Sequence, residues 1–253
     1  MKERIKRIKK SVVRIHVNGS PSGTGFIISE NGLIATCFHV VQSIQPGPNN
    51  QTQITHASNI EIELLDGTKL PGNIHKFCQN QGFLEALSKD YTLLEVKTTK
   101  TLEPFSIGSF ADIEEGDEIY ICGFPYGIDK PFISSGMLST KLSIKGYLEQ
   151  GTQRDAAMLD ITLNKGNSGG PVILMRDNPE EDIVIGIATF TMTPLSDHLK
   201  KLVAMIKTFP GNIVIMGVDF KTFSTLIKNS FENTSVGIGG CISIDYLNKI
   251  LKK

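Results

Sequence analysis

Ser168 lies in a glycine-rich segment, Gly166-Asn167-Ser168-Gly169-Gly170, directly before Pro171–Leu174, which is predicted to form an apolar strand. A nucleophilic serine needs a tight bend that projects its hydroxyl, and backbone N–H groups that converge on the oxygen that becomes negative in acyl transfer. Glycines permit the backbone angles of such a bend. The segment therefore predicts a serine nucleophile with the N–H groups of Gly166 and Ser168 as its oxyanion hole. Taken alone, a glycine-rich loop that only turns the chain is a serious alternative.

A serine hydroxyl is a weak nucleophile and needs a general base. Of the five histidines, His39 follows the apolar residues Gly32–Thr36 and lies where that predicted strand ends. Strand ends are where a rigid scaffold offers side chains to a cleft. The other four, at positions 16, 56, 75 and 198, lie in a strand pattern or in polar segments, where surface or packed histidines are usual. His39 is therefore the predicted base.

The base must be oriented by a carboxylate. Asp90 opens the apolar run Tyr91–Val96, so a buried or half-buried carboxylate is expected there. Asp66 is explained by its turn with Gly67, Asp155 by a loop, and Asp160 by a supporting role near the serine. Spacing alone favours Asp90 only modestly and leaves the others open.

The rest of the chain must supply strands that position these residues. Short alternating apolar segments recur from residue 11 onward, separated by turns such as Asn18–Gly23 and Asp66–Gly67. Glu30-Asn31-Gly32 predicts a two-residue hairpin loop, and residues 46–59 read as a polar surface loop. A polar stretch at 97–118 predicts a boundary between two halves. Many short strands with regular turns are typical of all-β barrels or sandwiches.

Three segments depart from this strand pattern. Residues 1–10 are basic and predict a solvated N-terminal arm. Residues 191–235 form a partly helical insertion, explained equally well as a packed decoration or as a lid or partner surface for a regulator or a second copy. The last residues predict a C-terminal helix.

Charge, apolar runs and cysteine spacing give no support for a nucleic-acid-binding, membrane-spanning or metal-binding protein. The formal net charge is zero, which gives no support for a nucleic acid or an anionic membrane as partner. No apolar run approaches the roughly 20 residues that cross a bilayer, and no signal peptide follows the basic start. The four cysteines are scattered without zinc spacing, so we expect reduced thiols and no metal or other cofactor. These features predict a cytoplasmic protein.

Seven blocks, in this order, carry a resemblance to a known family. They are Gly23–Ile28, Gly32–Val41, Lys89–Val96, Gly116–Gly127, Ser135–Met137, Asp160–Val172 and Gly237–Ile242. Together they resemble chymotrypsin-fold (trypsin-like) serine peptidases, and within them the HtrA/Deg protease domain.

The resemblance implies two antiparallel six-stranded β-barrels, over residues 11–104 and 105–253, with the active site between them. It implies His39 and Asp90 from the first barrel and Ser168 from the second, which selects Asp90 over Asp66. The implied activity is that of a serine endopeptidase acting on proteins or peptides through an acyl-enzyme. No PDZ domain is expected in this chain.

The predicted substrate pocket contains Thr162, Leu163 and Ala188, which favours a small or medium apolar residue before the cleaved bond. One alternative is a catalytically idle or partner-activated module that binds peptides on the same fold. A serine esterase is less favoured, because the Ser…Asp…His order of α/β-hydrolases is absent.

Overall fold

The computed structural model describes residues 1–46, 52–80, 82–145, 153–191 and 237–251, together with residues 205, 214–215, 218–219, 221–222 and 225–226. Most of the expected insertion at 191–235 therefore lies outside the described residues. The described pieces within it include the short strands β15 (Val214–Ile215) and β16 (Val218–Asp219), which pair with each other.

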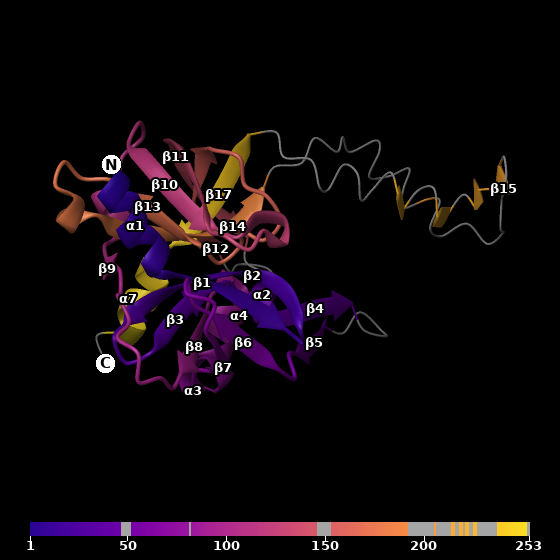
Figure 1. Cartoon of the computed structure of the whole chain (residues 1–253). Helices are drawn as coiled ribbons and strands as arrows, with labels where there is room; N and C mark the ends of the chain where they lie inside the picture. The colour runs from indigo at the N-terminus through magenta and orange to yellow at the C-terminus, as the bar shows by residue number, and fades with distance from the viewer. Residues whose placement is uncertain are drawn as a thin grey trace.

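The first half of the chain forms a closed antiparallel barrel of six strands (Figure 1). Going around the barrel, the strands are β1 (Val12–Val17), β2 (Ser20–Ser29), β3 (Leu33–Thr36), β8 (Thr92–Val96), β7 (Lys69–Ile74) and β6 (Ile60–Glu63). Pairing of β6 with β1 closes the ring. Their apolar side chains alternate toward the interior, where Ile15, Phe26 and Ile62 are fully buried.

The second half forms another closed ring of six antiparallel strands, above the first in Figure 1. The strands are β13 (Pro171–Leu174), β10 (Glu118–Gly123), β11 (Phe132–Lys145), β12 (Gln153–Asp160), β17 (Ile238–Ser243) and β14 (Ile183–Thr191). Pairing of β13 with β14 closes the ring, and β9 (Ser106–Ile107) adds a parallel edge to β14. The expected fold class is confirmed.

Short helices and the hairpin of β4 (Gln42–Pro46) and β5 (Thr52–His56) decorate the barrels. The helices are α1 (Lys2–Lys10), α2 (Phe38–Val41), α3 (Lys76–Gln79), α4 (Phe83–Lys89) and α7 (Asp245–Leu251), with 3₁₀ turns at Phe110–Asp112, Pro125–Gly127 and Pro179–Glu181. The two strands of the hairpin pair antiparallel. None of the helices among these described segments is long and apolar enough to span a bilayer.

The N-terminal segment differs from the expected solvated arm. Residues 2–10 form α1, which lies against the second barrel (Figure 1). Ile8 is buried, and Arg4 and Arg7 contact the buried carboxylate of Asp182. The basic pattern hid this docking because its acidic partner lies more than 170 residues further along the chain.

Two local expectations are corrected as well. The hairpin between β2 and β3 has the three-residue loop Glu30–Gly32, because Ser29 pairs directly with Leu33. Three-residue loops of this kind are a common hairpin connection with glycine at the last position. The segment expected to be a loop at 46–59 contains β5, whose Ile54 pairs with Ile44.

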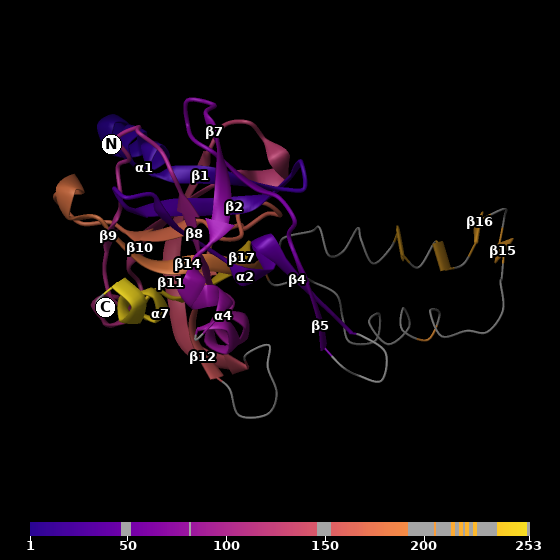
Figure 2. The same ribbon diagram turned by 90° about the horizontal axis from the view of Figure 1, so that it is seen from below.

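A continuous apolar core joins the two barrels. One cluster of buried side chains contains first-barrel residues such as Phe26 and Leu94 and second-barrel residues such as Phe124 and Ile187. Helix α7 contributes Tyr246 to it, whose ring stacks on that of Tyr91 at 6.0 Å (Figure 2 shows α7 near α4). This packing holds residues from both barrels in one fixed arrangement along the seam between them.

Candidate active site

His39 lies at the end of a first-barrel strand. Strand β3 ends at Thr36, and the single helical turn α2 begins at Phe38, so the backbone turns sharply at this point. Phe38, Val40 and Val41 are buried, which anchors the turn in the core. His39 points the other way, and 35% of its side chain is exposed. The imidazole is therefore held on a rigid element while one edge stays accessible.

Asp90 lies where α4 ends and β8 is about to begin. Its φ of +64° places it in the left-handed region and lets the chain leave the helix. Aspartate is one of the few non-glycine residues that adopt this conformation readily. Its side chain is fully buried. A buried carboxylate is costly unless hydrogen bonds and charges compensate for the lost water.

His39 supplies much of that compensation. Its Nδ1 lies 2.9 Å from Oδ2 and 3.0 Å from Oδ1 of Asp90, and its backbone N–H donates to Oδ1 at 3.2 Å. Contact with an ionised carboxylate favours a proton on Nδ1, which leaves Nε2 as the free acceptor. The pair thus has the arrangement of a base and its orienting carboxylate.

Electrostatics support the same roles. Burial lowers the pKa of His39, but the Asp90 carboxylate and its hydrogen bond raise it more, so the pKa lies above its ordinary value. Burial raises the pKa of Asp90, but the charge of His39 and the hydrogen bonds from His39 and Thr189 bring it below its ordinary value. Asp90 therefore stays ionised at neutral pH and stabilises a protonated imidazole.

Two second-barrel residues also reach Asp90. The hydroxyl of Thr189, on β14, donates a hydrogen bond to Oδ2. Nη1 of Arg154, near the start of β12, lies 3.7 Å from the same oxygen, and the Arg154 side chain is 8% exposed. Sequence reasoning missed both. Thr189 follows the predicted pocket residue Ala188, which was a usable hint, whereas nothing in the sequence around Arg154 indicated a contact with Asp90.

Ser168 comes from the loop between β12 and β13 and lies against the segment that carries His39. Its carbonyl accepts a hydrogen bond from the N–H of Thr24 at 2.9 Å. A side-chain carbon at Gly169 would lie 2.1 Å from Thr24 O and 3.1 Å from the N of Cys37, so only glycine fits this approach. The structure thus brings the serine loop and the histidine turn together, although they are about 130 residues apart in sequence.

The backbone around Ser168 is held by its carbonyl groups. The carbonyl of Lys165 accepts from the N–H of Tyr126 at 2.7 Å, and the carbonyl of Asn167 accepts from Gly170 at 3.0 Å. In a trans peptide the N–H points opposite to the C=O. The N–H groups of Gly166 and Ser168 therefore point away from the N–H groups of Tyr126 and Gly170 that hold the two carbonyls. Neither the Gly166 nor the Ser168 N–H has a hydrogen-bond acceptor among the residues described.

Gly166 has a φ of +102°, and a side-chain carbon there would lie 2.3 Å from the carbonyl oxygen of Phe124. Its own carbonyl accepts from the hydroxyl of Thr24 at 2.6 Å. Thr24 also accepts the N–H of Phe124, so one buried hydroxyl links β2 of the first barrel to the serine loop. These contacts make the loop conformation specific rather than adaptable.

Of the three residues predicted to form the substrate pocket, only Thr162 is exposed at the surface. Leu163 and Ala188 are buried in the core cluster of the second barrel, whereas Thr162 is exposed and lies beside Gly237. Leu163 and Ala188 therefore pack in the core of the second barrel. Residues 192–204, which follow β14, lie outside the described part of the chain.

Cys37 Sγ lies close to His39 and Asp90, with the three potential ligand atoms within 4.8 Å of one another. This thiol donates to the carbonyl of Ala188 at 3.3 Å, and burial holds its pKa well above its ordinary value. A metal would require the thiolate form. The donor set therefore fits a neutral packed thiol, and all four cysteines are buried and unpaired.

Comparison with known proteins agrees with this geometry. Residues 23–187 match the family of trypsin-like peptidase domains. A probable periplasmic serine endoprotease DegP-like of Rickettsia conorii is 29% identical over 184 residues, covering 71% of this chain and 30% of that protein. Human serine protease HTRA4 is 29% identical over 175 residues, covering 68% of this chain and 31% of that protein. The chain spans about a third of the length of the curated relatives it matches.

Among solved structures, HtrA-type protease AlgW with tripeptide aligns with a TM-score of 0.64. The alignment covers 99% of this chain and 62% of that chain at 18% sequence identity, so it bears on the fold alone.

Proposed function

The chain belongs to the family of trypsin-like peptidase domains, and from that premise we propose that it is a serine endopeptidase with Ser168 as nucleophile. One observation carries the proposal. The buried carboxylate of Asp90 contacts Nδ1 of the partly exposed His39, and this pair lies next to the loop that holds Ser168. This pairing supplies a base of defined tautomer, which a serine nucleophile requires.

The proposed reaction proceeds in two halves. Ser168 Oγ attacks the peptide carbonyl carbon while Nε2 of His39 takes the hydroxyl proton, and the carbonyl oxygen becomes an oxyanion. The N–H groups of Gly166 and Ser168 donate to that oxygen. Collapse breaks the C–N bond, and His39 returns its proton to the leaving amine. Water, deprotonated by His39, then hydrolyses the acyl-enzyme and regenerates Ser168.

Asp90 acts on His39 in both halves. Its carboxylate holds the proton on Nδ1 and stabilises the imidazolium that forms each time Nε2 accepts a proton. Thr189 keeps the carboxylate oriented, because its hydroxyl donates to the same oxygen that contacts Nδ1. The lowered pKa of Asp90 and the raised pKa of His39 both favour a negative charge on Asp90 beside a positive charge on His39.

The alternative of an idle binding module requires a serine loop with its amides turned away from the substrate. Two observations favour the active conformation instead. The carbonyl of Lys165 is anchored by Tyr126, and the carbonyl of Gly166 is anchored by Thr24. Rotating the peptide that joins Lys165 to Gly166 would break the hydrogen bond from the N–H of Tyr126 to the carbonyl of Lys165, whose net contribution is about 0.5–1.5 kcal/mol.

Cleavage of protein and peptide substrates tests the proposal. Wild type, Ser168→Ala and the matched surface variant Ser106→Ala are incubated with casein and with a peptide library, and cleavage is followed by mass spectrometry. Wild type and Ser106→Ala should cleave internal peptide bonds, and Ser168→Ala should not. Turnover of simple esters without peptide cleavage would indicate an esterase instead. Binding of peptides without any cleavage would indicate the idle module.

A further inference from the structure

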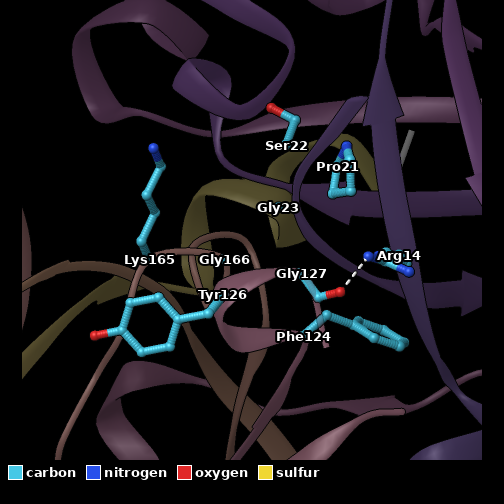
Figure 3. A pocket seen from close by; sticks show the side chains of 9 residues that line it. All are labelled: Arg14, Pro21, Ser22, Gly23, Phe124, Tyr126, Gly127, Lys165 and Gly166. Atoms are coloured by element: carbon cyan, nitrogen blue, oxygen red, sulfur yellow. Dashed lines mark hydrogen bonds between the residues drawn. The ribbon is translucent and has the colours of Figure 1, made fainter. Parts of the chain in front are cut away.

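A pocket of about 320 Å³ lies in the seam between the barrels, beside the serine loop. Figure 3 shows Arg14, Pro21 and Ser22 of the first barrel on one wall and Phe124, Tyr126 and Lys165 of the second barrel on the other. Gly166, whose N–H is assigned to the oxyanion hole, also lines it. The pocket is therefore next to the position of the reacting carbonyl.

This pocket lies on one side of the expected scissile bond. None of its lining residues belongs to the set Thr162, Leu163 and Ala188, which is expected to receive the residue before the bond. A peptide whose carbonyl oxygen contacts the N–H groups of Gly166 and Ser168 has its acyl side toward that set. Its leaving segment therefore extends toward the pocket, an assignment that rests on the proposed function.

Lys165 gives the pocket an available positive charge. Its side chain is exposed, and no carboxylate in the described part of the chain lies within ion-pair distance of it. Its carbonyl is held by the N–H of Tyr126, and the carbonyl of its neighbour Gly166 is held by the hydroxyl of Thr24, so the side chain extends from a fixed backbone.

The other charges around the pocket are already paired. Arg14 is 8% exposed, lies 2.8 Å from Asp129 and 3.8 Å from Glu63, and donates to the carbonyl of Gly127 at 2.5 Å. Glu63 also contacts His16 at 2.6 Å. Arg14 therefore neutralises the acidic groups at this wall, and Lys165 remains as the cation able to take a carboxylate from a ligand.

The remaining lining is apolar or aromatic. Pro21 and Phe124 offer apolar surface, and the ring of Tyr126 lies beside Lys165, with its hydroxyl donating to Asn164 at 3.0 Å. An anionic side chain with an aliphatic stem fits such a lining, because the stem packs on the rings while the charge meets the ammonium group.

We propose that this pocket binds a carboxylate on the leaving segment of the substrate, within two residues of the cleaved bond, and that Lys165 selects it. The carboxylate is either a glutamate or aspartate side chain or the free C-terminal carboxylate of a short substrate. Lys165 is thereby a specificity-determining residue of the proposed peptidase.

Binding of uncleaved peptides tests this independently of catalysis. The full chain carrying Ser168→Ala is titrated with fluorescein-labelled, C-terminally amidated peptides that have valine before the bond and Glu, Gln or Lys at either of the next two positions. A second series ends in a free carboxylate at the same positions. Fluorescence anisotropy then gives each Kd, and the two series distinguish the two sources of the carboxylate.

The Glu peptide or the free-carboxylate peptide should bind about three- to fivefold more tightly than its neutral match, as expected for an exposed ion pair worth up to about 1 kcal/mol. Raising NaCl from about 0.05 M to about 0.5 M should reduce this ratio. Added Lys165→Gln should bring the ratio to about one, whereas Lys165→Arg should preserve it. Lys97→Gln, which removes an exposed charge on the first barrel away from the pocket, should leave it unchanged.

A ratio of one in the Ser168→Ala protein, or a ratio that survives Lys165→Gln, would overturn the proposal. The same peptides, given to the chain with Ser168 intact, test the proposed function separately. Absence of cleavage would contradict the peptidase function, while the binding ratios would still decide the role of Lys165.

Discussion

Arg154 and Asp90 belong to different barrels, yet Nη1 of Arg154 lies 3.7 Å from Oδ2 of Asp90. Both side chains are buried, with exposed fractions of 8% and 0%. Asp90 therefore interacts with two positively charged partners whenever His39 is protonated. The guanidinium favours the ionised carboxylate and at the same time opposes the charge of the imidazolium. It limits how strongly Asp90 raises the pKa of His39.

Replacing Arg154 should shift the pH dependence of the active site. Burial lowers the pKa of His39, Asp90 raises it, and Arg154 lowers it again. Loss of the guanidinium in Arg154→Gln should therefore raise this pKa. Because His39 must be neutral to act as the base, the acidic midpoint of the rate should move to higher pH. The rate of labelling by a fluorophosphonate, measured from pH 5 to 9, checks this.

Arg154→Lys is the control, because it keeps the positive charge. The acidic limb of its pH profile, where the labelling rate falls as His39 becomes protonated, should stay close to that of the wild type. Thermal melts of both variants separate this effect from loss of folding. An acidic limb that stays in place or moves to lower pH in folded Arg154→Gln would contradict the account.

Two replacements of Asp90 separate its charge from its backbone conformation. Asp90→Asn removes the charge and should slow labelling by about 10⁴-fold, since the imidazole loses its orienting carboxylate. Asp90→Ala should slow it similarly and should also be less stable than Asp90→Asn by about 1–2 kcal/mol. The reason is the φ of +64°, which asparagine tolerates better than alanine. Urea unfolding gives the difference, and rapid labelling of Asp90→Asn would exclude Asp90 as the orienting group.

Gly166→Ala should abolish labelling through the shape of the oxyanion loop. The new methyl group would lie 2.3 Å from the carbonyl oxygen of Phe124, so the loop must shift and its amides must move. Gly19 provides a matched control, since its φ is also positive at +81° but no atom lies within 4 Å of an added methyl group. Gly19→Ala should cost about 1–2 kcal/mol in the free energy of unfolding and keep its labelling rate. Equal labelling of both variants would show that the loop is not held as described.

The docking of α1 should depend on Asp182. Oδ2 of Asp182 lies 3.0 Å from Nε of Arg4 and 3.4 Å from Arg7, and its side chain is 2% exposed. Asp182→Ala leaves the largely buried guanidinium of Arg4, which is 9% exposed, without this partner and should lower the free energy of unfolding by about 3 kcal/mol. Glu180→Ala removes an 80% exposed partner of Arg7 and should cost less than about 1 kcal/mol. Equal losses in urea unfolding would argue that α1 is not anchored through Asp182.

The fold was largely predictable from the sequence, because alternating apolar residues and turn signals mark most of the barrel strands. Pro171–Leu174 was predicted at its observed bounds. The helical segment Phe83–Lys89 was not, since it is short and its apolar face is defined by packing against Phe38 and the barrel. The docking of α1 was missed because it depends on a contact between distant parts of the chain.

The residues of the candidate site were likewise predictable only in part. His39, Asp90 and Ser168 could be selected from local pattern and family resemblance, and the structure brings the segments that carry them together. Thr189 and Arg154 contact Asp90 only because the two barrels pack against each other. Their roles depend on three-dimensional neighbours that no local spacing reveals. The same holds for the pocket beside Lys165, whose walls come from both barrels.

Covalent labelling tests the central claim most directly. The wild-type chain is treated with a fluorophosphonate at neutral pH, and the intact mass and the modified peptide are determined. A single adduct on Ser168, retained in Ser106→Ala and absent from Ser168→Ala, is the predicted result. An adduct that persists in Ser168→Ala, or no adduct on the folded wild type, would contradict the assignment of Ser168 as an activated nucleophile.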